Sequence, residues 1–235
     1  MEKIQSSGVV PIAMPGTHER FLPFFEERTK NPKAKVLDIG AGHGAMTKRL
    51  HEMGYAVQAC DLFPEYFRFP EIPCDRVDIM ETFPYSDQSF ESAIAIEVME
   101  HIPDHEHFFR EAFRLLEPGG RLFLSTPNIL SLKSRIRFLF TGFFYSFKPL
   151  DHGRHDGLQH VSSLTLDQFD YLAIKAGFLP AKVQIDRKQK SSRWWLVLYP
   201  IMGWFARWKK TGMQHNSMDL LLGRLLFLEY EKPRS

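Results

Sequence analysis

The chain has 235 residues, 44% of them hydrophobic and 25% charged, which is typical of one globular α/β domain. Its net charge of +2 is too small to indicate nucleic acid as a partner, so any basic patch must be local. No apolar run reaches the roughly 20 residues of a membrane-spanning helix, the first residues lack a signal-peptide pattern, and the two cysteines suggest reduced thiols, so a cytoplasmic protein is expected.

The N-terminal part predicts a loose lead-in at 1–16 followed by an amphipathic helix at 18–30, where apolar residues recur at helical spacing. We therefore divide the chain into a lead-in and helix at 1–33 and a main domain at 34–235. Residues near 130–160 and 191–218 are predicted to be insertions in the main domain.

The main domain opens with an apolar run at 36–39 that ends in three alternating glycines, Gly40, Gly42 and Gly44. A helical pattern follows directly, so the stretch predicts a strand, a tight loop and a helix N-terminus. Glycine allows positive φ and lets a ligand approach without a Cβ in the way. A nucleotide-like cofactor is the first inference.

Asp38 separates two cofactor classes. The pyrophosphate of a dinucleotide binds at a helix N-terminus, and an adjacent carboxylate would repel it. S-adenosylmethionine instead carries an ammonium and a sulfonium, which a carboxylate attracts. Because Gly40, Gly42 and Ala45 also satisfy the dinucleotide pattern, an NAD(P)-dependent oxidoreductase stays open as an alternative.

A second strand at 55–60 ends at Asp61, 19 residues after Gly42. Nucleotide-binding folds place a carboxylate for the ribose hydroxyls at this distance. The remaining elements are strands at 76–79, 92–96, 121–125, 182–185 and 225–229, a helix after Asp104, and a helix at 166–176 with a capping box at Thr165. Their alternation predicts a doubly wound, largely parallel sheet with its ligand beyond the strand carboxyl ends.

Taken in order, these motifs resemble the class I S-adenosylmethionine-dependent methyltransferases. The resemblance rests on 36–44, Asp61, Asp78, 83–85, 97–101 and 117–120. It implies a Rossmann-like, seven-stranded, mostly parallel sheet with an antiparallel last hairpin, to which the residues themselves add aromatic-basic helical insertions. It also implies that the glycine loop holds the methionine and sugar, Asp61 the ribose, and Asp78 with Ile79 the adenine. The full set of cofactor-binding candidates is Asp38, Gly40, Ala41, Gly42, Gly44, Asp61, Leu62, Asp78, Ile79 and Glu97.

Within that class, Glu97-x-x-Glu100-His101 followed by His160 is similar to O-methyltransferases of the ubiquinone pathway and of bacterial surface-glycan and lipid loci. Small-RNA 2′-O-methyltransferases share the Glu-x-x-Glu-His element and hold a divalent metal with it. The metal candidates are therefore Glu97, Glu100, His101 and His160, whose oxygen and nitrogen donors favour Mg²⁺ or Mn²⁺ over a thiolate metal.

An alcohol or phenol acceptor must lose its proton during methyl transfer, and histidine is the natural base at neutral pH. His101 and His160 are the catalytic candidates. The expected function is O-methylation of a small-molecule or lipid-linked acceptor. A metal-assisted RNA or quinone-precursor methyltransferase and a non-catalytic cofactor-binding scaffold are the alternatives.

Two segments interleave aromatic and basic residues, at 130–148 and 193–210, and the second holds all four tryptophans. Rings flanked by cations suit the membrane–water interface, so contact with a membrane surface, at its inner face for a cytoplasmic protein, is one of two open interpretations. A hydrophobic lid or a homodimer interface is the competing interpretation. Stacking on nucleic acid is disfavoured by the low net charge.

Overall fold

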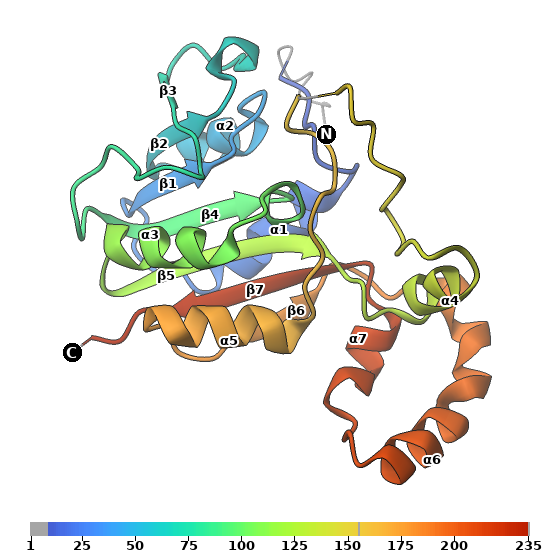
Figure 1. The fold of residues 1–235 in the computed structure, drawn as a ribbon. Coiled ribbons are helices and arrows are strands. Elements are labelled where there is room, and N and C mark those ends of the chain that lie inside the picture. The colour runs from blue at the N-terminus through green and yellow to red at the C-terminus, as the bar shows by residue number, and fades with distance from the viewer. Residues whose placement is uncertain (1–8, 155, 235) are drawn as a thin grey trace, which may run out of the picture.

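The computed structural model describes residues 9–154 and 156–234. Within these residues, seven strands form one sheet in the order β3-β2-β1-β4-β5-β7-β6 (Figure 1). The strands are β1 (Lys35–Ile39), β2 (Ala56–Asp61), β3 (Cys74–Arg76), β4 (Phe90–Ile96), β5 (Leu116–Pro127), β6 (Lys182–Ile185) and β7 (Leu225–Glu231). The first five run parallel, whereas β7 is antiparallel to both β5 and β6. The predicted fold class is confirmed.

Helices cover both faces of this sheet (Figure 1). On one face, α3 and α5 pack through Phe108, Phe109 and Phe169. On the other, α1 and α2 pack through Phe21 and Leu50, among others. The helices are α1 (Thr17–Glu26), α2 (Ala45–Glu52), α3 (His105–Leu115), α4 (Leu132–Thr141), α5 (Leu166–Ala176), α6 (Tyr199–Lys209) and α7 (Met218–Leu222).

Side-chain alternation along the strands supplies both layers, as expected for a sheet buried on its two faces. In β4, Ala93 and Ala95 face the α3 side, while Ile94 between them faces α1. In β5, Phe123 lies on the α1 side and is 0% exposed. Its ring meets that of Phe25 at 4.9 Å between centroids. The N-terminal helix therefore shares a hydrophobic core with the sheet.

Several element boundaries differ from the predicted ones. The strand predicted at 76–79 is β3, Cys74–Arg76, so Val77, Asp78 and Ile79 lie in the loop that follows it. The helix predicted at 18–30 ends at Glu26, because the N–H groups of Arg28 and Thr29 both turn back to the carbonyl of Phe25. The strand predicted at 121–125 begins earlier, at Leu116. Its glycine-containing start is paired with the end of the chain, where Gly119 donates to Lys232 and Lys232 donates to Gly120.

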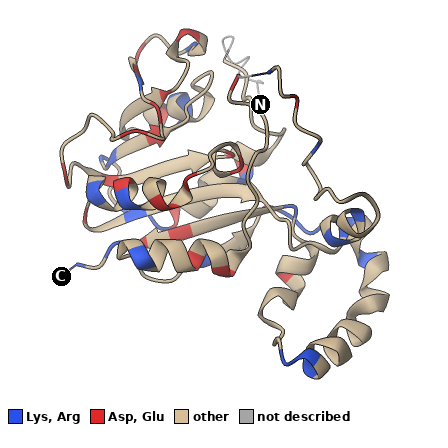
Figure 2. Cartoon of the chain, viewed as in Figure 1, with Lys and Arg blue, Asp and Glu red and all other residues tan. Residues whose placement is uncertain are grey.

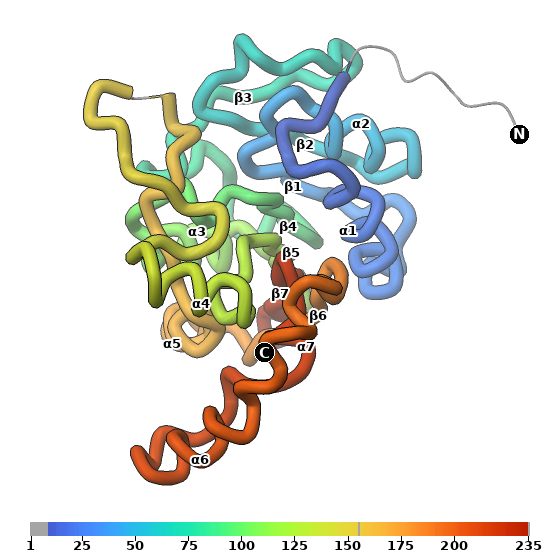
Figure 3. The backbone as a smooth tube through the Cα atoms, turned by 90° about the vertical axis from the view of Figure 1, so that its right-hand side faces the viewer, coloured from blue at the N-terminus to red at the C-terminus, as the bar shows by residue number. Residues whose placement is uncertain are grey.

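Two segments extend from the sheet as a helical lobe. We define the aromatic-basic lobe as residues 129–150, which include α4, and residues 187–218, which include the 3₁₀ segment Lys190–Leu198 and α6. Figures 1 and 3 show α6 projecting away from the sheet in both views. Among the described residues, no helix is both long enough and apolar enough to cross a membrane.

Candidate functional site

A cavity of about 860 Å³ lies at the carboxyl ends of β1, β2 and β4. This is the edge at which open α/β sheets bind ligands. Its walls include every predicted cofactor-binding residue except Gly44, and both predicted catalytic histidines. Residues far apart in the sequence thus meet at one place because the parallel strands all end there.

The glycine loop after β1 has the predicted backbone geometry. Gly40, Gly42 and Gly44 have φ values of 71°, 54° and 82°, a region that residues with a Cβ rarely adopt. A Cβ on Gly40 would lie 2.6 Å from Val98, and one on Gly44 would lie 2.6 Å from the Phe67 ring. These positions therefore require glycine for two reasons: the backbone has positive φ, and neighbouring side chains leave no space for a Cβ.

Asp61 ties this loop to the end of β2. One carboxylate oxygen accepts the N–H of Gly42 at 2.8 Å, and the other accepts the N–H of Phe63 at 2.8 Å. Each oxygen keeps further acceptor capacity for a hydroxyl. Since Asp61 also lines the cavity, it can fix the loop and face a ligand together.

Asp38 is 2% exposed, and its Oδ2 accepts the hydroxyl of Thr47 at 2.6 Å. Burial raises the pKa of Asp38 to about 6. A buried carboxylate beside a ligand cavity has its charge poorly compensated, so it favours a ligand that brings positive charge. Sequence reasoning gave Asp38 this role.

The predicted adenine side lies beyond β3. Asp78 and Ile79 line the cavity together with Leu62, and Asp78 holds its own turn by accepting the N–H of Met80 at 2.9 Å. Phe63 and Tyr66 also line the cavity and were not predicted. Two aromatic residues shortly after Asp61 were the signal that could have identified them.

The lead-in forms part of the site, which sequence reasoning missed. Residues 1–8 lie outside the described residues, but Pro11, Ile12, Ala13 and Met14 line the cavity. The Met14 N–H donates to Glu97 at 2.9 Å. A lead-in with no regular periodicity carries no local signal for such a contact.

Glu97, predicted both as a cofactor contact and as a metal ligand, lines the cavity with φ at 54°. Burial raises its pKa, and the hydrogen bond from the Met14 N–H opposes that shift. Glu97 is not part of the group whose ligand atoms meet, and one of its carboxylate oxygens instead accepts the Met14 N–H.

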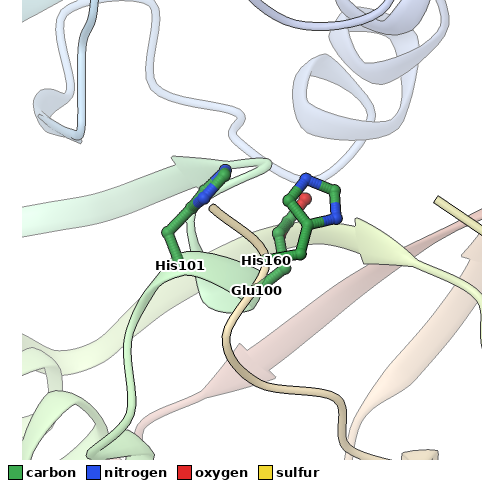
Figure 4. Close-up of side chains that lie close together, drawn as sticks. All are labelled: Glu100, His101 and His160. Carbon is green, nitrogen blue, oxygen red and sulfur yellow. The ribbon is translucent and has the colours of Figure 1, made fainter. Parts of the chain in front are cut away.

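The other three metal candidates do come together (Figure 4). Glu100 and His101 belong to the 3₁₀ turn Met99–His101 after β4, and His160 comes from the loop before α5. Ligand atoms of the three lie within 4.8 Å of one another. One carboxylate oxygen of Glu100 and Nδ1 of His160 are buried and, among the described residues, have no hydrogen-bond partner.

Hydrogen bonding defines the tautomer of His101. Its Nδ1 lies 3.0 Å from the carbonyl of Gln159, which can only accept, so Nδ1 carries the proton and Nε2 keeps a lone pair. Burial lowers the pKa of His101, and it lowers the pKa of His160 to about 4. Both rings are therefore neutral at pH 7. Their centroids are 4.9 Å apart.

Glu100 has the opposite shift. It is 2% exposed, and burial next to the charge of Glu97 raises its pKa to about 8. A protonated carboxylic acid at neutral pH can donate a hydrogen bond, whereas a cation would favour its ionised form. The cluster thus contains two neutral bases and one neutral acid.

These features fit S-adenosylmethionine better than a dinucleotide. The glycine loop lines the cavity at Gly40 and Gly42. The carboxylates of Asp38, Asp61 and Glu97 line the cavity, where they suit an ammonium, a sulfonium and ribose hydroxyls and would oppose a pyrophosphate.

Comparison with known proteins agrees. Residues 13–182 match the family model described as "Methyltransferase domain". The ubiquinone biosynthesis O-methyltransferase of Psychrobacter arcticus is 29% identical over 175 residues, which are 69% of this chain and 66% of the relative. That of Xanthomonas oryzae pv. oryzae is 34% identical over 116 residues, 46% of this chain and 48% of the relative. The chain thus spans slightly less than two thirds, or about half, of these relatives.

Solved structures show the same fold at low identity. A SAM-dependent methyltransferase from Archaeoglobus fulgidus superposes with a TM-score of 0.60 at 15% identity, covering 91% of this chain and 90% of that one. Phosphoethanolamine N-methyltransferase 2 of Haemonchus contortus, solved with S-adenosyl-L-methionine, has a TM-score of 0.59 at 17% identity, covering 95% of this chain and 54% of that one. The second part of the aromatic-basic lobe, 187–218, lies beyond the family match.

Proposed function

This chain belongs to the methyltransferase domain family, as a class I S-adenosylmethionine-dependent enzyme, and we propose that it methylates an oxygen of a small-molecule or lipid-linked acceptor. One observation carries the choice of oxygen. A neutral histidine with a free Nε2 lines the same cavity as the glycine loop. The ubiquinone-pathway O-methyltransferases among its relatives support the same acceptor atom.

The residues that would hold the cofactor are those of the glycine loop with Asp38, Asp61, Asp78 and Glu97. When bound, S-adenosylmethionine supplies an electrophilic methyl group on a sulfonium. The carboxylate of Asp38 favours the positive charge, and Asp61 faces the hydroxyls. The chain's own contribution is therefore to position the acceptor and keep water away from it.

His101 is the proposed general base. Its Nδ1–H is held by the Gln159 carbonyl, so the ring has one orientation and Nε2 is the atom that accepts the acceptor proton. The resulting imidazolium keeps its Nδ1–H hydrogen bond, which strengthens on charging. The His160 ring lies 4.9 Å from the His101 ring and 5.2 Å from the Phe147 ring between centroids, so it helps to shape the cavity beside His101.

A second candidate function is cation-assisted methyl transfer, favoured by the meeting of Glu100, His101 and His160. The orphaned atoms of Glu100 and His160 are donors that a cation would satisfy. A cation there would lower the pKa of an acceptor hydroxyl. Because Glu97 lies outside the cluster, one carboxylate and two imidazoles remain, a set that suits Mn²⁺ better than the oxygen-preferring Mg²⁺.

The test is formation of S-adenosylhomocysteine from S-adenosylmethionine with phenolic and polyprenyl-phenol acceptors, with and without EDTA. We expect His101→Ala to lower kcat on the order of 10²–10⁴-fold while the cofactor Kd stays unchanged. His107→Ala is the matched control, since His107 does not line the cavity and its ring hydrogen-bonds the Glu81 carbonyl.

Two results would count against the proposal: His101→Ala retaining full turnover, or losing cofactor affinity as well as rate. Calorimetric titration of EDTA-treated protein with MnCl₂ and MgCl₂, compared with Glu100→Gln, separates the second candidate. Cation binding that Glu100→Gln abolishes supports it, and no heat of binding in the wild type rejects it.

A further inference from the structure

Charge is distributed unevenly between the aromatic-basic lobe and the rest of the chain. The lobe contains eleven Lys and Arg residues and no Asp or Glu. The remaining residues contain nineteen Lys and Arg against 28 Asp and Glu. Figure 2 shows the cations on α4 and at the end of α6, and most of the acidic residues elsewhere. The net charge of +2 is therefore the sum of a strongly basic lobe and an acidic remainder of the chain.

The same lobe exposes large apolar side chains. Trp194 is 85% exposed, Trp204 is 64% exposed and Trp208 is 62% exposed. On α4, Leu139 is 72% exposed and Phe140 is 78% exposed. Monomeric soluble proteins rarely expose apolar residues in such a group, and those that do use them for interaction.

Helix α6 contributes almost nothing to the core. Its exposed Ile201, Trp204, Phe205 and Trp208 follow helical spacing along one face, and Ala206 is its buried residue. An eleven-residue helix without tertiary packing is marginal in water. The apolar face of α6 therefore needs a surface to lie on.

Four cations lie before α6 or at its carboxyl end. Arg193, Arg207, Lys209 and Lys210 are exposed, and within the described part of the chain none of them pairs with a carboxylate. Lys209 instead lies over the ring of Trp208, 4.2 Å from its centroid. Aromatic rings at the level of cationic side chains are the arrangement found at the membrane–water interface.

Charge complementarity selects the occupant. In a two-fold dimer the same patch would meet itself, and a lobe with no acidic residue would place cations against cations. An anionic lipid surface supplies the opposite sign over the same area. The chain also connects the lobe to the site, because Ser146 in the loop after α4 lines the cavity.

We propose that the aromatic-basic lobe binds the surface of a membrane that contains anionic lipids, with the apolar face of α6 in the interface. The cavity then opens beside that surface. The proposal concerns binding alone and does not depend on methyl transfer.

All four tryptophans lie between 194 and 208, so indole fluorescence reports on the lobe and on no other part of the protein. We would add vesicles of phosphatidylcholine with phosphatidylglycerol, or of phosphatidylcholine alone, to the full chain and measure emission and co-flotation. We expect a blue shift and flotation with the anionic vesicles, both reduced by high salt because exposed charges are screened.

Two sets of variants test the residues separately. Lys209→Gln with Lys210→Gln should weaken the partition about 25-fold, at about fivefold for each cation. Trp204→Ser with Trp208→Ser should weaken it by more than about tenfold. Tyr171→Ser, on the solvent face of α5, and Lys30→Gln with Lys33→Gln are the matched controls and should bind like the wild type.

Absence of both blue shift and flotation in the wild type would overturn the proposal. So would equal binding by the Lys209 and Lys210 variant and its control. Sedimentation equilibrium measures self-association. If the wild type forms a dimer and does not bind vesicles, and if Trp204→Ser with Trp208→Ser dissociates that dimer, the lobe binds a second copy of the chain instead. Since no cofactor is present, these outcomes leave the methyl-transfer proposal untouched.

Discussion

Replacing Asp61 by asparagine tests how the cofactor loop is held. The carboxylate accepts the Gly42 N–H and the Phe63 N–H, each at 2.8 Å. An asparagine amide has one oxygen, so one of these N–H groups would face an NH₂ donor instead of an acceptor. Losing a hydrogen bond to a charged group costs about 1.5–3 kcal/mol. If that cost falls on the loop in its binding conformation, S-adenosylmethionine affinity drops by about 10- to 150-fold.

Calorimetric titration with S-adenosylmethionine measures this change, and thermal unfolding monitors the fold alongside it. Asp75→Asn is the matched control, because Asp75 accepts two side-chain hydrogen bonds, from Gln58 and Tyr85, on the neighbouring strand but does not line the cavity. It should bind the cofactor like the wild type. Asp61→Asn binding within about twofold of wild type, or an equal loss in both variants, would refute the reasoning.

Three further outcomes are expected. Burial raises the pKa of Asp38 to about 6, and the cofactor cation favours the ionised carboxylate, so affinity for S-adenosylmethionine should be constant above that pH and fall about tenfold per pH unit below it. Calorimetric titrations across this pH range measure the change. The same pH dependence in Asp38→Asn would contradict the prediction. Gly40→Ala should weaken S-adenosylmethionine binding by about 1–2 kcal/mol for the positive φ alone, and by more because the added Cβ contacts Val98. Adding Val98→Ala to this variant should restore part of the lost affinity. No restoration would mean that the contact with Val98 does not affect binding. Phe123→Ala should lower the free energy of unfolding by about 3–5 kcal/mol, measured in urea, since its ring is buried against α1; a loss below about 1 kcal/mol would show that α1 contributes little to the core.

Much of the fold and of the cofactor site could be predicted because the signals are local. Glycines at alternate positions after an apolar run define a loop whatever surrounds them, and the distance to Asp61 follows from one strand–helix–strand unit. Helix caps behaved in the same way: Asp104 accepts the N–H of His107, and the Thr165 N–H donates to Gln168. These interactions join residues that are close in the sequence, so the sequence spacing alone predicts which groups meet.

Contacts between distant segments could not be predicted. Met14 and Glu97 are 83 residues apart, and nothing in either neighbourhood indicates that they meet. The same holds for His160, which reaches Glu100 and His101 from a separate loop. Its presence was suggested by resemblance, whereas the exclusion of Glu97 from that group became visible only when the N-terminal segment was placed.

The most direct test of the central claim is calorimetric titration of the purified wild-type chain with S-adenosylmethionine and, separately, with NADH. The account predicts micromolar binding of S-adenosylmethionine and no heat of binding with NADH, because the cavity carboxylates favour a cationic ligand and oppose a pyrophosphate. Binding of NADH without S-adenosylmethionine would contradict the assignment of the glycine loop and of Asp38.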